Sequence, residues 1–435
     1  MEQTHMDTIS TSQPSKASVF RIFIPFALGY FLSYLYRVVN AVIAPDLVAD
    51  LGIDPSELGL LTSTYFIAFA SSQLPLGMLL DRFGPRLVEA FLLIFAGVGA
   101  IIFAMSDTLT GVIIGRAFIG FGVSACLMAA FKSYVIWFPA NILSRVNGFQ
   151  MAAGGLGALA AATPVEFALH FTDWRGVFLI LAFLSFAVAL AVFFVVPESK
   201  EKTSPEKFRT QIEGIGKVFK SPYFWRIAPL TTMAQAGYIS LQALWIGPWL
   251  RDVAGMSRAD IAIILSWAAL AMIAGFISLG YLAEKLFQKG IPVLTTAVSG
   301  MSIFIGIQAM ITFDVPLSPT VVLILFGFFG SSGILSYTAL TMGFPKTLSG
   351  RVTTSINMMV FVGAFVAQWA VGAVINLWEV SATGNYDPAG YRVGFMGLLG
   401  CQVLGLFWFW ISSLINGRTN NTDKANNTNK GKNNN

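Results

Sequence analysis

One positively charged residue, Arg37, stands inside a long apolar stretch near the start of the chain. A charge near the middle of a bilayer costs about 2.5–3.5 kcal/mol, so it normally faces a cavity or a partner. The same stretch contains no Asp or Glu. Ser33, Tyr34 and Asn40 lie at helical spacing from Arg37, and Tyr30 continues that face. These residues predict a polar wall that binds an anion; the alternative is an arginine bonded to carbonyl groups of a broken neighbouring helix.

Three more charged residues lie in apolar stretches of the first half of the chain: Arg116, Lys132 and Glu166. Lys132 is predicted either to contact the anion or to extend its amine to the membrane surface. Arg116 lies sixteen residues earlier, about 160° around a helix, so the two cannot face one cavity at one angle. Glu166 stands one turn before His170, and this pair either titrates a proton or lies at the membrane interface. The excess of buried cations favours an anionic ligand.

A second polar stripe lies in the apolar stretch at residues 225–250. Two glutamines alternate with aromatic residues at spacings of three and four, which places them on one helical face. An aromatic stripe is often simple packing, but an amide that faces lipid is costly. We therefore expect this face to line the same cavity. The predicted cavity residues of the second half are Gln235, Tyr238, Gln242, Trp245, Tyr337 and Asn357.

The elements that position these residues are apolar segments long enough to span a membrane. Apolar residues make up 55% of the 435 residues and charged residues 11%, whereas soluble proteins carry about 25% charged residues. This composition excludes a soluble enzyme, a nucleic-acid-binding protein and a secreted disulfide scaffold. We expect an all-α integral membrane protein with twelve helices in the lipid bilayer. Their predicted limits are 20–45, 57–80, 87–105, 110–137, 146–170, 176–196, 225–250, 260–284, 291–312, 319–344, 352–378 and 392–415.

Residues that bind metals or act as nucleophiles are scarce. The chain has two cysteines, Cys126 and Cys401, and two histidines, His5 and His170. No nucleophile–base set and no ATP-binding loop of the Gly-x-x-x-x-Gly-Lys type is present in the sequence. We expect no cofactor, no metal and no catalysis, and any energy must come from an ion gradient or a partner.

Basic residues divide unevenly between the two sides of the predicted membrane. Twenty Lys or Arg residues fall on the side of the chain ends and four on the other, so both termini are expected in the cytoplasm. This bias, rather than nucleic acid, explains the net charge of +5. The predicted division is a disordered cytoplasmic N-terminus at 1–18, a six-helix half at 19–196, a cytoplasmic central loop at 197–224, a second six-helix half at 225–415 and a disordered cytoplasmic tail at 416–435.

The two halves repeat each other at an offset of 203 residues, which becomes 206 near residue 140. Caps, glycines and charges match in register, which random apolar helices would not do. Within each half, two of the matched residues are three positions apart, which is the spacing of a capping box: Asp54 with Glu57, and Ser257 with Asp260. Duplicated six-helix halves are typical of transporters that hold their substrate near the bilayer midplane. The aligned pairs include Gly52 with Gly255, Asp54 with Ser257, Glu57 with Asp260 and Asp81 with Glu284.

Several motifs carry a resemblance to a known family. Gly77-Met-Leu-Leu-Asp81-Arg82-Phe-Gly84-Pro-Arg86 resembles the loop signature of the major facilitator superfamily, and Glu284-Lys285 belongs to a degenerate second copy. Arg116-x-x-x-Gly120-x-Gly122 is similar to a second motif. Tyr34-Leu-Tyr-Arg37-Val-Val-Asn40 resembles the first helix of the organic-anion branch, often called anion:cation symporters. That branch usually has an Asp before the arginine where this chain has Tyr36, so a proton role of that acid cannot be carried over.

The resemblance implies a conformational latch at the cytoplasmic face and a structural or coupling role for Arg116; Glu166 is placed in the same group. It implies a monomeric secondary transporter in the bacterial inner membrane that imports a small organic anion with protons or sodium, its two halves rocking about a central site. The alternatives are an exporter of drugs, metabolites or siderophores, and a transporter-like nutrient sensor. The latch residues are Gly77, Asp81, Arg82, Gly84, Arg86, Glu284 and Lys285.

Overall fold

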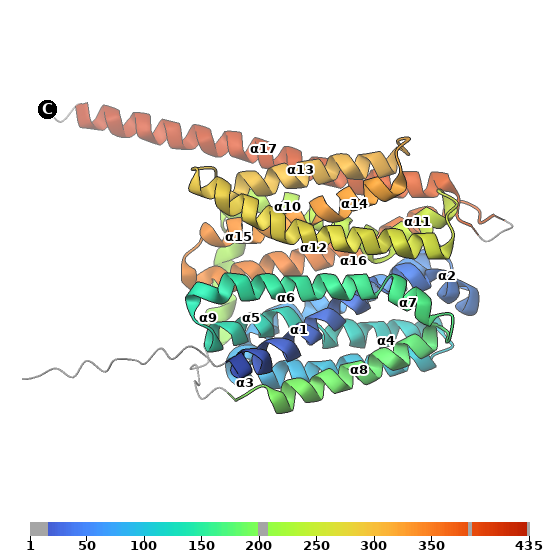
Figure 1. Cartoon of the computed structure of the whole chain (residues 1–435). Helices are drawn as coiled ribbons and strands as arrows, with labels where there is room; N and C mark the ends of the chain where they lie inside the picture. Colours follow the sequence, from blue (N-terminus) through green and yellow to red (C-terminus); the bar gives the residue numbers. More distant parts are fainter. Residues whose placement is uncertain (1–15, 199–207, 382–384, 433–435) are drawn as a thin grey trace, which may run out of the picture.

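The computed structural model describes residues 16–198, 208–381 and 385–432, and these residues form helices and no strand. In Figure 1 the first half of the chain, blue to green, lies below the second half, yellow to red. The predicted all-α membrane fold is confirmed. The first half contains α1 (Lys16–Val38), α2 (Asn40–Leu51), α3 (Pro55–Met105), α4 (Leu109–Gly122), α5 (Cys126–Trp137), α6 (Ala140–Ala160), α7 (Thr163–Ala168) and α8 (Trp174–Val195).

The second half follows a short connecting helix, α9 (Phe208–Phe219). Its elements are α10 (Pro222–Ser240), the π-helical turn η1 (Leu241–Trp245), α11 (Ile246–Asp252), α12 (Arg258–Gln288), α13 (Val293–Thr312), α14 (Pro319–Gly330), the 3₁₀ turn η2 (Ser331–Gly333), α15 (Ile334–Met342), the 3₁₀ turn η3 (Lys346–Leu348), α16 (Ser349–Ile375) and α17 (Pro388–Lys432).

The helix lengths are consistent with the twelve predicted spans. Nine helices of the described chain are long and apolar enough to cross a membrane, and the bent pair α1–α2 makes a tenth. The 51 residues of α3 would reach about 77 Å, more than twice the hydrocarbon thickness. This helix is broken at Gly84, with φ 76° and ψ 160°, and so supplies two spans. The continuous run α10–η1–α11 supplies the remaining one.

The duplication is visible in how corresponding helices begin. The Asp54 carboxylate accepts from Glu57 N at 2.7 Å, and the Glu57 carboxylate accepts from Asp54 N at 3.0 Å. In the second half, the Ser257 hydroxyl accepts from the backbone N–H three residues later at 3.2 Å. The glycines that precede these caps have φ angles of 63° and 64°, a left-handed conformation that other residues adopt only with strain. Both halves therefore use one device to stop a helix and start the next.

Four of the membrane-spanning segments are interrupted near their middle. α1 and α2 meet at Val39 with a bend of 47°, and α4 gives way to α5 over Val123–Ala125. The corresponding segments of the second half carry the turns η1 and η2. Such breaks free backbone polar groups and are tolerated where they line a cavity or are buried in protein. They surround the site described below.

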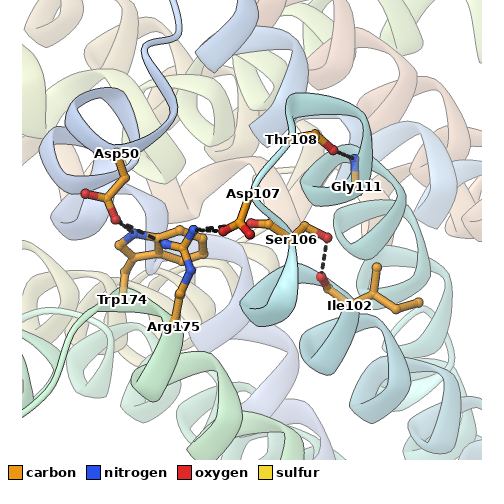
Figure 2. Close-up of polar contacts among 8 residues, drawn as sticks. All are labelled: Asp50, Ile102, Ser106, Asp107, Thr108, Gly111, Trp174 and Arg175. Carbon is orange, nitrogen blue, oxygen red and sulfur yellow. Dashed lines mark hydrogen bonds and ion pairs between the residues drawn. The ribbon is translucent and has the colours of Figure 1, made fainter.

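The two ends of the bundle differ. We call the end where α9 lies the basic end, on the left in Figure 1, and the end that carries α2 and α7 the opposite end. At the opposite end, Arg175 donates to Asp50 at 3.1 Å and to Asp107 at 2.7 Å, while Trp174 also donates to Asp50 (Figure 2). This cluster joins α2, the α3–α4 turn and the start of α8.

Two predicted irregular regions differ from the structure. The central loop expected at 197–224 contains α9, because apolar residues at helical spacing allow it to bury Val218 and pack Gly214 against Arg351 of α16. The tail expected to be disordered at 416–435 is helical as far as Lys432. No proline follows Pro388, and extending a helix is easier than nucleating one. Residues 1–15, 199–207, 382–384 and 433–435 lie outside the described chain, so most of the N-terminus expected at 1–18 does too.

The capping box at Asp54 also joins the halves, because Asn376 donates to its second oxygen at 3.2 Å. We expect Asp54→Ala to lower stability by about 1–2 kcal/mol, since it leaves helix N–H groups without an acceptor. Asn376→Ala, which removes only the contact between halves, should cost less. Melting temperatures of both purified variants in detergent provide the comparison, and equal losses would contradict a capping role.

Candidate binding site between the two halves

A cavity of about 380 Å³ lies between the two halves, next to the interrupted helices. It is lined by residues of α1, α3, α10, α15 and α16, among others. Eight of the eleven predicted binding residues lie in its wall, from both halves of the chain. These are Tyr30, Tyr34, Arg37, Gln235, Tyr238, Gln242, Tyr337 and Asn357.

Arg37 is the cation of this cavity wall. Its side chain is buried, with 6% exposed, and the guanidinium carbon lies 4.3 Å from the ring centre of Tyr34 and 5.0 Å from that of Phe361. No carboxylate of the described residues pairs with it, and its Nε has no hydrogen-bond partner. Aromatic rings stabilise a cation without neutralising it. The positive charge is therefore held in place and left available to a ligand.

Amide groups span the cavity from one half to the other. The side-chain amide of Asn357 of α16 donates to the side-chain Oε1 of Gln73 of α3 at 3.0 Å and accepts from the Tyr337 hydroxyl at 3.2 Å. Gln235 donates to the Gly330 carbonyl at 3.1 Å, where α14 ends in η2. The hydroxyl of Tyr238 is buried and has no hydrogen-bond partner among the residues that the structure describes. A ligand that offers both donors and acceptors can therefore bond to both halves at once.

Three predicted binding residues lie elsewhere. The Trp245 indole donates to the Gln368 backbone carbonyl at 2.9 Å, and its ring packs between Gly59 of α3 and Gly372 of α16. Asn40 is fully buried just beyond the break at Val39, and neither polar atom of its amide has a hydrogen-bond partner in the described part of the chain. Lys132 forms an ion pair with Asp81 at the basic end. Sequence spacing did not predict Gln73, which lies in the cavity wall. Gln73 belongs to the first half of the chain and bonds to Asn357 of the second half.

A second cavity of about 370 Å³ continues towards the basic end. It shares Met128, Phe131 and Thr353 with the central cavity. Asp81 and Lys132 line it from the first half, and the first turn of α16 lines it from the second. The opposite end is joined by contacts between halves. They are Asp46 with Arg258 at 2.5 Å, Thr62 with Gln368 at 2.6 Å, Thr163 with Ser266 at 2.7 Å and Asp54 with Asn376 at 3.2 Å.

The other predicted latch residues lie around this second cavity or on the surface. Gly77 lines it. Arg86 donates to the Val196 carbonyl and to Glu198, which ties the break at Gly84 to the end of α8. Arg82 stacks on Phe83, and Lys285 on Tyr281 beside exposed Glu284.

The two residues predicted to have structural or coupling roles are separated. Arg116 is buried with its guanidinium over the Tyr65 ring, 5.0 Å from the centroid. Glu166 pairs with His170 at 3.1 Å on α7 at the opposite end, where His170 is largely exposed. This pair therefore lies at the end of the bundle, away from the central cavity.

A bundle of membrane-spanning helices, broken around a cavity that is closed at one end, has the architecture of a membrane transporter. A family model agrees: that of the Major Facilitator Superfamily matches residues 26–368. The chain belongs to this superfamily, and the resemblance seen in its loop motifs is confirmed.

Named relatives and solved structures are similar over most of the chain. The probable sulfoacetate transporter of Cupriavidus necator is 22% identical over 83% of this chain and 87% of its own length. The hexuronate transporter of Escherichia coli K12 is 26% identical over 65% of this chain and 69% of its own length. A bacterial homologue of the lysosomal transporter Spinster, solved in an inward-facing, unoccupied conformation, superposes with a TM-score of 0.72 at 17% identity, covering 92% and 98% of the two chains.

We expect Asp81→Asn to slow transport about tenfold and to change equilibrium substrate affinity little, because Asp81 lies outside the central cavity and pairs with Lys132. Uptake rates and binding affinities measured on the same preparation test this. Loss of binding in a folded Asp81→Asn protein would show that Asp81 belongs to the binding site instead.

Proposed function

We propose that this protein imports a small organic anion across the bacterial inner membrane by alternating access, coupled to a proton or sodium gradient. The observation that carries the proposal is the Arg37 guanidinium, which lies in a cavity between two duplicated halves and pairs with no carboxylate of the described residues. A buried charge needs an opposite charge, and the described cavity wall offers none. The anion would supply it.

The cavity wall favours an anion that also carries hydroxyl groups. Arg37 is joined by amides and phenols, including Gln242, Tyr238 and Asn357, which bond to hydroxyls rather than to bare hydrocarbon. The printed names of two relatives, a sulfoacetate and a hexuronate transporter, are both those of organic anions. We therefore propose a monoanionic sugar acid or a sulfonate of similar size as the substrate.

The distribution of Lys and Arg residues determines which end of the helix bundle we assign to the cytoplasm. With the basic end and both termini in the cytoplasm, the biased Lys and Arg residues obey the positive-inside rule. The structure would then be open towards the cytoplasm and closed outside, by contacts such as Asp46–Arg258. Export is the alternative suggested by the glycine-rich stretch of α6. There Gly154 and Gly157 approach Tyr30 and Phe31 of α1, which gives those glycines a packing role.

The first test concerns Arg37. A charge-assisted hydrogen bond is worth about 1.5–3 kcal/mol, so Arg37→Ala should weaken binding about ten- to over a hundredfold. Arg37→Lys should restore only part, because it keeps the charge and loses the planar fork. Binding to glucuronate, galacturonate and sulfoacetate should be measured with the melting temperature of each purified variant.

Arg392→Ala is the matched control, because Arg392 pairs with Asp314 away from the cavity; its affinity should equal that of the unaltered protein. A structural Arg37 would give the reverse pattern, a lower melting temperature with normal affinity, and would remove the main support for an anionic substrate.

The second test concerns closure of the opposite end. Arg258→Gln should lengthen the distance between spin labels at Leu51→Cys and Ala259→Cys, in a Cys401→Ser background, because the Asp46–Arg258 pair holds the halves together. Arg251→Gln removes a pair of the same 2.5 Å length within one half and should leave the distances unchanged. Identical distance distributions in both variants would contradict this closure.

A further inference from the structure

Glu89 of α3 is a buried acid that has no role in the binding site described above. Its side chain is fully buried, and neither carboxylate oxygen has a hydrogen-bond partner among the described residues. It packs against α1 at Gly29 and is not one of the residues that line the central cavity. A Cβ added at Gly29 would collide with the Glu89 carboxylate and lie 3.7 Å from the Cys126 sulfur. The neighbouring residue, Tyr30, lines the central cavity.

The groups around Glu89 leave its charge uncompensated. α1 presents backbone at Gly29, and α5 presents the Cys126 thiol and Tyr134. The Tyr134 hydroxyl donates to Gln150 at 2.7 Å instead.

The cations of the helices packed on α3 are engaged elsewhere. Lys132 of α5 pairs with Asp81, Arg37 of α1 stacks on Tyr34, and Arg116 of α4 stacks on Tyr65. At the start of α8, Arg175 binds Asp50 and Asp107. On α3 itself, Arg86 binds Glu198 and Arg82 stacks on Phe83. Arg351 of α16 donates to the Thr347 backbone carbonyl. An ionised carboxylate in such a place costs several kcal/mol, and a protonated one costs much less. In this conformation Glu89 therefore holds a proton.

The surroundings of Glu89 can also change. Cys126 is the first residue of α5, directly after the break over Val123–Ala125, and α1 ends at the bend at Val39. Interrupted helices of this kind are the elements that move or reorient around transport sites. Two turns beyond Cys126, on the same face of α5, the buried hydroxyl of Ser133 has no hydrogen-bond partner within residues 16–198, 208–381 and 385–432. It marks a polar position between Glu89 and the basic end.

We propose that Glu89 is the proton-binding group of the transport cycle, which rests on the proposed import of an anion. The Glu89 carboxylate takes up one proton from the outer side when the opposite end is open, and it stays neutral while the halves change conformation with the anion bound to Arg37. It releases the proton to the cytoplasm once α1 and α5 have moved and its carboxylate is hydrated. One proton and one monoanion then cross together, so no net charge moves.

The test uses the full-length protein in proteoliposomes with a labelled monoanion, glucuronate or galacturonate. Exchange of substrate across the membrane at equal pH needs no net proton movement, whereas accumulation driven by an alkaline interior does. Glu89→Gln, which mimics the protonated acid, should keep exchange within about twofold and lose at least about tenfold of the accumulation. A membrane potential without a pH gradient should drive little uptake in the unaltered protein.

Glu57→Gln is the matched control, because glutamine can still complete the capping box at the end of the bundle, and it should accumulate normally. Accumulation by Glu89→Gln equal to that of the unaltered protein would overturn the proposal. So would accumulation driven by sodium alone, or loss of accumulation in Glu166→Gln with Glu89→Gln unaffected. Absence of exchange for every anion in the unaltered protein would instead refute the proposed function.

If Glu89→Gln does not yield folded protein, Glu89→Asp decides the question. A shortened acid in the same pocket still binds a proton but at a different affinity, so the midpoint of the pH dependence of uptake should shift. An unchanged midpoint in folded Glu89→Asp protein would overturn the proposal.

Discussion

The free energy of keeping one guanidinium away from water without a counter-charge is the constraint on which this structure depends. Hydrocarbon cannot solvate Arg37, and no carboxylate of the described chain pairs with it. The surrounding fold compensates through the aromatic rings of Tyr34 and Phe361 and through a polar cavity. The helices that line this cavity are broken rather than continuous. The breaks include the bend at Val39 between α1 and α2 and the π-helical turn η1 between α10 and α11.

Hydrophobic periodicity and charge were enough to predict the fold and eight of the residues that line the cavity. Length and apolarity set the spans, and the helical period showed which residues share a face. Arg37, Tyr34, Gln235 and Tyr238 were found this way, because each lies on a regular stretch of helix before an interruption.

The misplaced residues show what periodicity cannot supply. Asn40 follows the bend at Val39, Trp245 ends the π-helical turn, and Lys132 follows the break before α5. A π turn has more residues per turn than an α-helix, and a bend rotates everything after it, so a face extrapolated across either one is wrong. Lys132 also had a partner distant in sequence, Asp81. Glu89 was missed because it lies near the start of an apolar stretch, where only the packed neighbours reveal how deeply it is buried.

The two oxygens of the Asp54 carboxylate have separate duties. One accepts from the first turn of its own helix and the other from Asn376 of the other half. Any change at Asp54 therefore alters folding and the balance between conformations together, whereas a change at Asn376 alters only the second. Evolution, or an engineer who wants a faster or slower protein, can adjust the preference between the two open states at position 376 and leave the integrity of the helix untouched. Position 54 offers no such freedom.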